Sequence, residues 1–218
     1  RLRGNRAIGS LLAVVGAAFG TVRAIDIWLD PMLGLAMDRT RTPWGRYRVW
    51  MVIGAPILMG ALYMLFNAPK GATSTYLIIW LLVMYLGLSI VSLSHSAWAA
   101  VLATSYQERS RIFGILAAVG VGGSMAVLAI PIVMSSLGHT DAEGVQAMGW
   151  FIIGLIPIAV LAVVARTPER ITRDEHGHFK LKDYGALFLR PNVLRILAAD
   201  LCVTLGPGWM AALYLFFF

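Results

Sequence analysis

Three charged side chains lie inside the first long apolar stretch of the sequence. The segment RAIDIWLDP places Arg23, Asp26 and Asp30 three and four residues apart. In an α-helix this spacing puts them on one face, in line with Gly34 and Asp38. A charged group near the centre of a bilayer costs at least ~2.5–3.5 kcal/mol, so it faces a partner or a watery cavity. One arginine cannot neutralise two carboxylates, and the excess negative charge favours a site for a coupling cation or a proton.

Two structural explanations stay open for this segment. Arg23 can pair with Asp26 within the helix, which would make the charges a neutralised structural contact. Pro31 cannot donate a hydrogen bond to the carbonyl of Ile27, and such a carbonyl either holds an ion in a broken transporter helix or marks a plain kink. The second carboxylate, at Asp30, favours the ion site.

The composition places these residues in a membrane protein. Hydrophobic residues make up 59% of the 218-residue chain and charged residues 13%, and the mean hydropathy is +0.76. These values lie well outside the range of soluble globular domains. Stretches of about 20 apolar residues can cross a bilayer as helices. The sequence contains six of them, at residues 7–36, 49–67, 76–103, 110–137, 146–165 and 194–218. They lack the alternating pattern of a membrane β-barrel, so we expect an all-α integral membrane bundle.

The basic residues indicate which loops face the cytoplasm. Lysine and arginine concentrate in residues 37–48, 104–111 and 166–195, whereas 68–75 and 137–145 hold few. Cytoplasmic loops have such an excess, so the net charge of +7 is a topology signal, and we expect no nucleic-acid partner. We predict a multi-pass protein of the bacterial cytoplasmic (inner) membrane, surrounded by the lipid bilayer and without an obligate protein partner.

A charged segment divides the sequence. Five spans form an N-terminal bundle at 1–165, a cytoplasmic linker follows at 166–193, and 194–218 begins a second bundle. The sequence starts without methionine and stops within an apolar run, so we expect a fragment of a longer chain. We expect no cofactor, and no metal beyond a possible sodium ion at Asp26 and Asp30.

The loop after the first span has a recognisable signature. Its residues are Gly34, Asp38, Arg39, Gly45, Arg46 and Arg48. This pattern, Gly-x-x-x-Asp-Arg and then Gly-Arg-x-Arg, resembles the loop between the second and third helices of the major facilitator superfamily. With the preceding DP and the inserted residues, it is similar to the melibiose-permease-like family of glycoside-pentoside-hexuronide:cation symporters. The runs SAWAAVLATSYQERSRIFG and RTPER resemble later segments of that family. At Gly34 the missing side chain would let a partner helix approach closely.

This resemblance implies a major facilitator-type helical bundle, of which the chain would supply helices two to seven of twelve. It implies that Asp26 and Asp30 bind the coupling cation with Arg23 nearby. Ser94 and Trp98, on the family's fourth helix, would complete this site. The loop residues would form a cytoplasmic gate, because their charge-assisted bonds can hold neighbouring helix ends together.

The implied function is secondary active transport. A small solute of the sugar, glycoside or sugar-acid class would cross with a cation by alternating access. The chain departs from the family at Leu29 and Ser94, which replace an amide and a carboxylate, and at Leu116 and Ala117, where an arginine is usual. Sodium needs several oxygen ligands, whereas two carboxylates one helical turn apart can share a proton. We therefore expect the proton in preference to sodium as the coupling ion.

A non-transporting sensor or scaffold of the same fold is the alternative to a carrier. In that protein the intramembrane charges would serve only helix packing. We do not expect an enzyme, because the sequence has no Ser/His/Asp set, no HExxH motif and no protease-like pair of aspartates.

Overall fold

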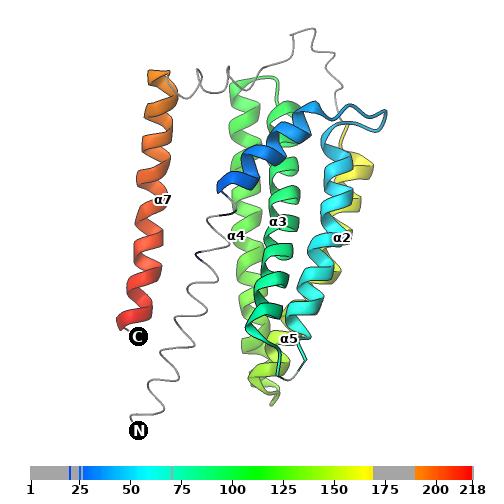
Figure 1. The fold of residues 1–218 in the computed structure, drawn as a ribbon, viewed down its shortest axis with the longest axis vertical. Coiled ribbons are helices and arrows are strands. Elements are labelled where there is room, and N and C mark those ends of the chain that lie inside the picture. Colours follow the sequence, from blue (N-terminus) through cyan, green and yellow to red (C-terminus); the bar gives the residue numbers. More distant parts are fainter. Residues whose placement is uncertain (1–19, 21–24, 26, 70, 169–189, 218) are drawn as a thin grey trace. The chain divides into compact units, whose positions relative to one another are not determined.

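The computed structural model describes residues 20, 25, 27–69, 71–168 and 190–217. A helix covers residues 27–39, and five longer helices follow (Figure 1). They are α2 (Tyr47–Phe66), α3 (Ser74–Leu102), α4 (Tyr106–Ser136), α5 (Asp141–Arg166) and α7 (Pro191–Phe217). All regular structure in this part of the chain is helical, as predicted. The helices fall into two units, with α7 in a unit separate from the other helices.

Four of the six predicted spans are present as single helices. Helices α2, α3, α4 and α5 contain 20, 29, 31 and 26 residues and are apolar enough to cross a membrane. At 1.5 Å per residue, even the shortest is about 30 Å long, which matches the hydrocarbon core of a bilayer. Much of the first predicted span, 7–36, lies outside the described residues. Residues 194–217 of the sixth predicted span, 194–218, lie in helix α7.

The helix boundaries follow from local sequence signals. Thr73, before α3, accepts a hydrogen bond from the backbone N–H of Tyr76. Ser105 and Thr140, before α4 and α5, each form a reciprocal capping box with the glutamate three residues later. Such boxes satisfy backbone donors that a helix start leaves unpaired. Each helix thus begins at a defined residue. The connections between the four helices are short, and neighbouring helices run in opposite directions (Figure 1).

The core lies between α2, α3 and α5 and includes the end of helix 27–39. Its buried members are Met37, Tyr47, Met51, Ala55, Ile90, Trp98 and Val160. Glycines allow α2 and α3 to approach closely. A Cβ on Gly87 would lie 2.7 Å from the backbone N of Leu58, and one on Gly54 would lie 2.6 Å from Cγ2 of Ile90. The two helices therefore lie so close together at these glycines that a larger residue would not fit.

The close approach expected at Gly34 is not found. A Cβ at that position would meet no atom of the described residues within 4 Å, and the same holds for Gly122 in α4. Helix α4 has no buried residue at all among those described. Among the described residues the tight contact between helices lies elsewhere, at Gly54 and Gly87, so the expectation for Gly34 stays a prediction.

Candidate functional site

Asp30 provides the described part of the predicted cation site. Its side chain is partly exposed, yet its Oδ1 atom is buried and has no hydrogen-bond partner among the described residues. Leu33 and Met37, three and seven residues later, pack in the core. Residues at this spacing share one helix face, so Asp30 lies on the side turned toward the bundle. A buried and unpaired carboxylate oxygen is costly, and a bound proton or cation would remove that cost.

The other two charges of the sequence motif cannot be placed. Arg23 and Asp26 lie outside the described residues. The suggestion that Asp26 and Asp30 form one site, with Arg23 beside them, therefore stays a prediction.

Ser94 and Trp98 lie one helical turn apart in α3. Both are buried, with 0% and 2% of their surface exposed. The Ser94 hydroxyl donates to the carbonyls of Ile90 and Val91 in its own helix, at 2.7 and 3.0 Å. One hydroxyl has a single proton to donate, so Ser94 can offer a further partner only its oxygen lone pairs. Among the described residues the indole Nε1 of Trp98 has no acceptor.

The predicted gate residues divide into separate contacts. The Asp38 carboxylate and the Arg46 guanidinium form an ion pair at 3.8 Å, with 52% and 29% of their side chains exposed. Arg39 is exposed. Gly45 is buried and has a φ of +111°, a backbone conformation that residues other than glycine rarely adopt. The motif thus builds a tight turn between helix 27–39 and α2.

Arg48 contacts two other helices of the bundle. Its Nη2 donates a hydrogen bond of 3.0 Å to the carbonyl of Thr167, the residue that ends α5. Its guanidinium also lies 5.6 Å from the centre of the Trp98 ring. Arg48 therefore connects α2 with α3 and α5 at the end of the bundle that the charge pattern assigns to the cytoplasm.

Sequence reasoning missed two residues that fix this turn. The indole Nε1 of Trp50 donates to the hydroxyl of Thr40 at 3.0 Å. That hydroxyl donates to the carbonyl of Ala36 at 2.7 Å. The Thr40 position just after an expected helix end could have suggested a capping role, but its link to Trp50 needs the folded chain.

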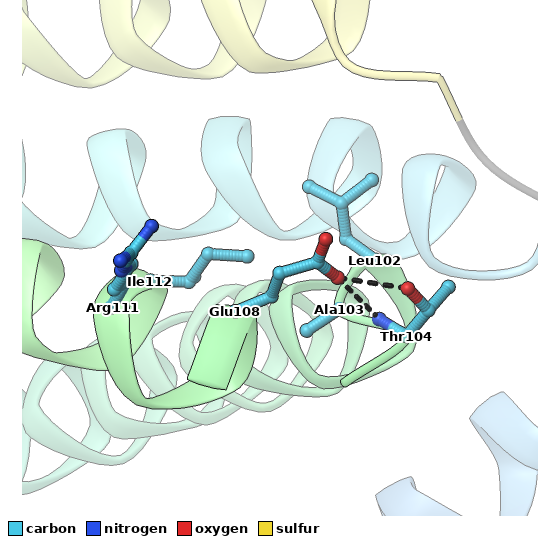
Figure 2. A pocket seen from close by; sticks show the side chains of 6 residues that line it. All are labelled: Leu102, Ala103, Thr104, Glu108, Arg111 and Ile112. Atoms are coloured by element: carbon cyan, nitrogen blue, oxygen red, sulfur yellow. Dashed lines mark hydrogen bonds between the residues drawn. The ribbon is translucent and has the colours of Figure 1, made fainter. Parts of the chain in front are cut away.

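A shallow pocket of about 340 Å³ lies where α3 meets α4. Its lining residues are Leu102, Ala103, Thr104, Glu108, Arg111 and Ile112. Figure 2 shows the Glu108 carboxylate turned toward Thr104. It accepts hydrogen bonds from the backbone N–H of Thr104 at 3.0 Å and from its hydroxyl at 2.8 Å. These bonds cap the start of α4, so we interpret the pocket as part of the helix connection.

Comparison with known proteins identifies the family. Residues 5–218 match the family described as MFS/sugar transport protein. The raffinose carrier protein of Pediococcus pentosaceus is 27% identical over 172 residues, which are 74% of this chain and 26% of that protein. The isoprimeverose transporter of Lactiplantibacillus pentosus is 28% identical over 176 residues, or 75% of this chain and 36% of that protein. The putative glycoside/cation symporter YagG of Escherichia coli is 29% identical over 175 residues, or 75% and 37%.

The chain spans from 26% to 37% of the length of these relatives. No solved structure matches it. The family consists of transport proteins and not of enzymes, and its bacterial relatives together with the apolar helices confirm a multi-pass membrane protein. The resemblance and the helical fold class that the loop signature predicted are likewise confirmed. The chain belongs to the MFS/sugar transport protein family.

Proposed function

We propose that the chain is part of a cation-coupled symporter that carries a small solute by alternating access. The observation that carries this proposal is the buried Oδ1 of Asp30, which lies on the core-facing side of its helix and has no hydrogen-bond partner among the described residues. A carboxylate held there without a protein partner suits an ion that binds and leaves during the transport cycle.

The solute we propose is a sugar, a glycoside or a sugar acid. Relatives are named for raffinose, isoprimeverose and glycosides, and others are lactose permeases. In this chain Trp98 supports the proposal, because a buried indole whose N–H has no acceptor among the described residues offers an apolar face and a donor to a hydroxylated ring. Leu116 and Ala117, where the family usually has an arginine, suggest that recognition of the solute differs from that of melibiose carriers.

The coupling ion we propose is the proton. Sodium is the alternative, with Asp26 and Asp30 as ligands. Leu29 supplies no oxygen ligand, and the Ser94 hydroxyl proton is already donated within α3. A serine oxygen in that state can accept a bond from a protonated carboxyl group. Asp26 and Asp30 would form the titrating pair, with Arg23 nearby and Ser94 as an acceptor.

The cytoplasmic gate we propose consists of the turn between helix 27–39 and α2. The Asp38 to Arg46 ion pair and the Arg48 bond to Thr167 join three helix ends in this region. Gly34 and Arg39 complete the motif by sequence, without a contact that assigns them a role. Because these bonds join exposed or partly exposed ends, they can break and form again as the bundle rocks.

The test is accumulation of solute by vesicles that contain the whole protein. Labelled lactose, raffinose and a panel of glycosides and sugar acids are offered with and without an imposed cation gradient. We expect Asp30→Asn to abolish accumulation while exchange of solute without a gradient continues. Asp141→Asn is the matched control, since that aspartate is exposed at the start of α5. If no solute accumulates under any gradient, a sensor or scaffold of the same fold becomes the better reading.

A further inference from the structure

Arg48 contacts three helices through one side chain. It belongs to the first turn of α2, its Nη2 donates to Thr167 at the end of α5, and its guanidinium faces the Trp98 ring of α3 at 5.6 Å. A guanidinium within about 6 Å of an aromatic ring is attracted to the ring face, more strongly when the pair is shielded from water. Trp98 is 2% exposed, so this contact is well shielded.

The contact restricts the orientation of the Trp98 side chain. The guanidinium lies against the ring, and the core packs around the indole. Within the described part of the chain, no residue accepts a hydrogen bond from its Nε1 and so fixes the ring. The position of Trp98 therefore depends on packing and on Arg48.

The bond to Thr167 sets the position of Arg48 in turn. Thr167 is the C-terminal cap of α5, where free carbonyls give a helix end a partial negative charge that favours a cation. A bond from a charged donor is stronger than one between neutral groups. A shift of the end of α5 would pull the guanidinium relative to the Trp98 ring.

Helices α2 and α5 are also joined by contacts that involve neither Arg48 nor Trp98. At the opposite end of the same two helices, Gln146 donates to Asn67 at 2.9 Å, and the Tyr63 and Trp150 rings pack edge to face at 5.7 Å. Those contacts join the helices without reaching α3. The arrangement at Arg48 adds a third helix and a buried aromatic ring.

We propose that Arg48 is a positioning residue for Trp98 and links that side chain to the end of α5. Arg48 belongs to the gate motif by sequence, but this role differs from that of the Asp38 to Arg46 ion pair. The inference rests on the proposed function only in taking Trp98 as part of the solute site. Movement of the gate would then change the orientation of the indole, and a solute bound against the indole would favour one position of α5.

The first test measures the orientation of Trp98 without any solute. The whole protein is labelled with 5-fluorotryptophan, and its ¹⁹F resonance for Trp98 is assigned by its loss in Trp98→Phe. We expect Arg48→Gln, which keeps a hydrogen-bond donor but removes the cation, to shift and broaden this resonance. Arg48→Lys keeps the cation and should restore most of the narrow signal. Arg41→Gln is the matched control, because it removes an exposed arginine of the same turn that is not a member of the gate motif.

The result that overturns the inference is an unchanged Trp98 resonance in Arg48→Gln, or an equal change in Arg41→Gln. A general loss of structure would alter the signals of the other tryptophans as well, and Arg48→Lys then decides: a narrow Trp98 signal supports the inference and a broad one opposes it. Uptake kinetics form the second arm. For a labelled sugar that the vesicles accumulate, Arg48→Gln should raise KM roughly tenfold with a smaller change in maximal rate.

The two arms separate the two proposals. Should the fluorine signal respond to Arg48 while no sugar accumulates in the vesicles, the positioning of Trp98 stands and the proposed function fails. If sugar accumulates normally but the Trp98 signal does not change in the Arg48 variants, the proposed function stands and the positioning role of Arg48 fails.

Discussion

Asp38 and Arg46 form an ion pair, with 3.8 Å between Oδ1 and Nη1, that joins the end of helix 27–39 to the residue before α2. Both side chains keep contact with solvent. An ion pair at such a position contributes about 1 kcal/mol or less to stability. Its effect should therefore appear in the balance between conformations and not in the unfolding of the protein.

Removing this pair should favour the state that is open to the cytoplasm. We expect Asp38→Asn and Arg46→Gln to shift the carrier in the same direction, because each removes the charge-assisted contact that holds the turn closed. The measurement is the rate at which an impermeant maleimide labels Ser94→Cys from each side of the membrane, in a Cys202→Ser background. Ser94 is buried, so its labelling requires opening.

The charge-exchanged variant Asp38→Arg with Arg46→Asp is the control for this prediction. It restores a pair of opposite charges, and we expect it to return the labelling rate toward that of the starting protein. Faster labelling from the cytoplasmic side in neither single variant would reduce the motif to a signal for membrane orientation.

Gly87→Ala should destabilise the bundle. Its Cβ would lie 2.7 Å from the backbone N of Leu58, and a helix backbone can move aside only if the whole α2 to α3 contact shifts. Overpacking of this kind costs about 1–3 kcal/mol. Thermal unfolding in detergent measures the loss. Gly60→Ala is the control in α2, because its Cβ meets nothing within 4 Å; an equal loss in both variants would contradict the packing explanation.

Gly45→Ala should disturb the gate through the backbone. Alanine at a φ of +111° is strained by about 1–2 kcal/mol, and the N–H of Gly45 donates to the carbonyl of Thr42 within the turn at 3.2 Å. Gly138→Ala is a matched control, since Gly138 has a φ of +85° in the connection between α4 and α5. Both variants should unfold at lower temperature, but only Gly45→Ala should change the maleimide labelling of Ser94→Cys.

The spans and the turn were predictable because their signals are local. Long apolar stretches predict α2 to α5, and the capping boxes at Ser105 and Thr140 depend on residues three positions apart. The position of Asp30 on the inner helix face follows from its spacing to Leu33 and Met37. These relationships need only the geometry of one helix.

The contacts between helices could not be predicted in this way. Arg48 and Thr167 are 119 residues apart, and the sequence gives no sign that one donates to the other. The same applies to the face on which two helices meet: glycines at 34, 54 and 87 look alike in sequence, yet among the described residues only the last two lie in a tight contact. Such choices depend on how side chains of separate helices fit together.

The coupling ion gives the last prediction. With Asp26 and Asp30 as a pair that shares a proton, an imposed pH gradient should drive accumulation of solute at constant sodium concentration. Sodium added at a fixed pH should have little effect, because Leu29 offers no oxygen ligand and Ser94 offers one neutral hydroxyl oxygen where the melibiose-permease-like family has a carboxylate. The measurement is the initial rate of uptake of a labelled sugar into vesicles under each condition.

Asp30→Asn and Ser94→Ala complete that experiment. The asparagine cannot release a proton, so we expect it to abolish the response to the pH gradient and to leave exchange of solute. Ser94→Ala removes an acceptor and should weaken the response without removing it, because the carboxyl group that titrates is retained. Stimulation by sodium alone, lost in Asp30→Asn and indifferent to the pH gradient, would show sodium coupling at the same site. Uptake that responds to neither ion and is unchanged in Asp30→Asn would exclude Asp30 from coupling altogether.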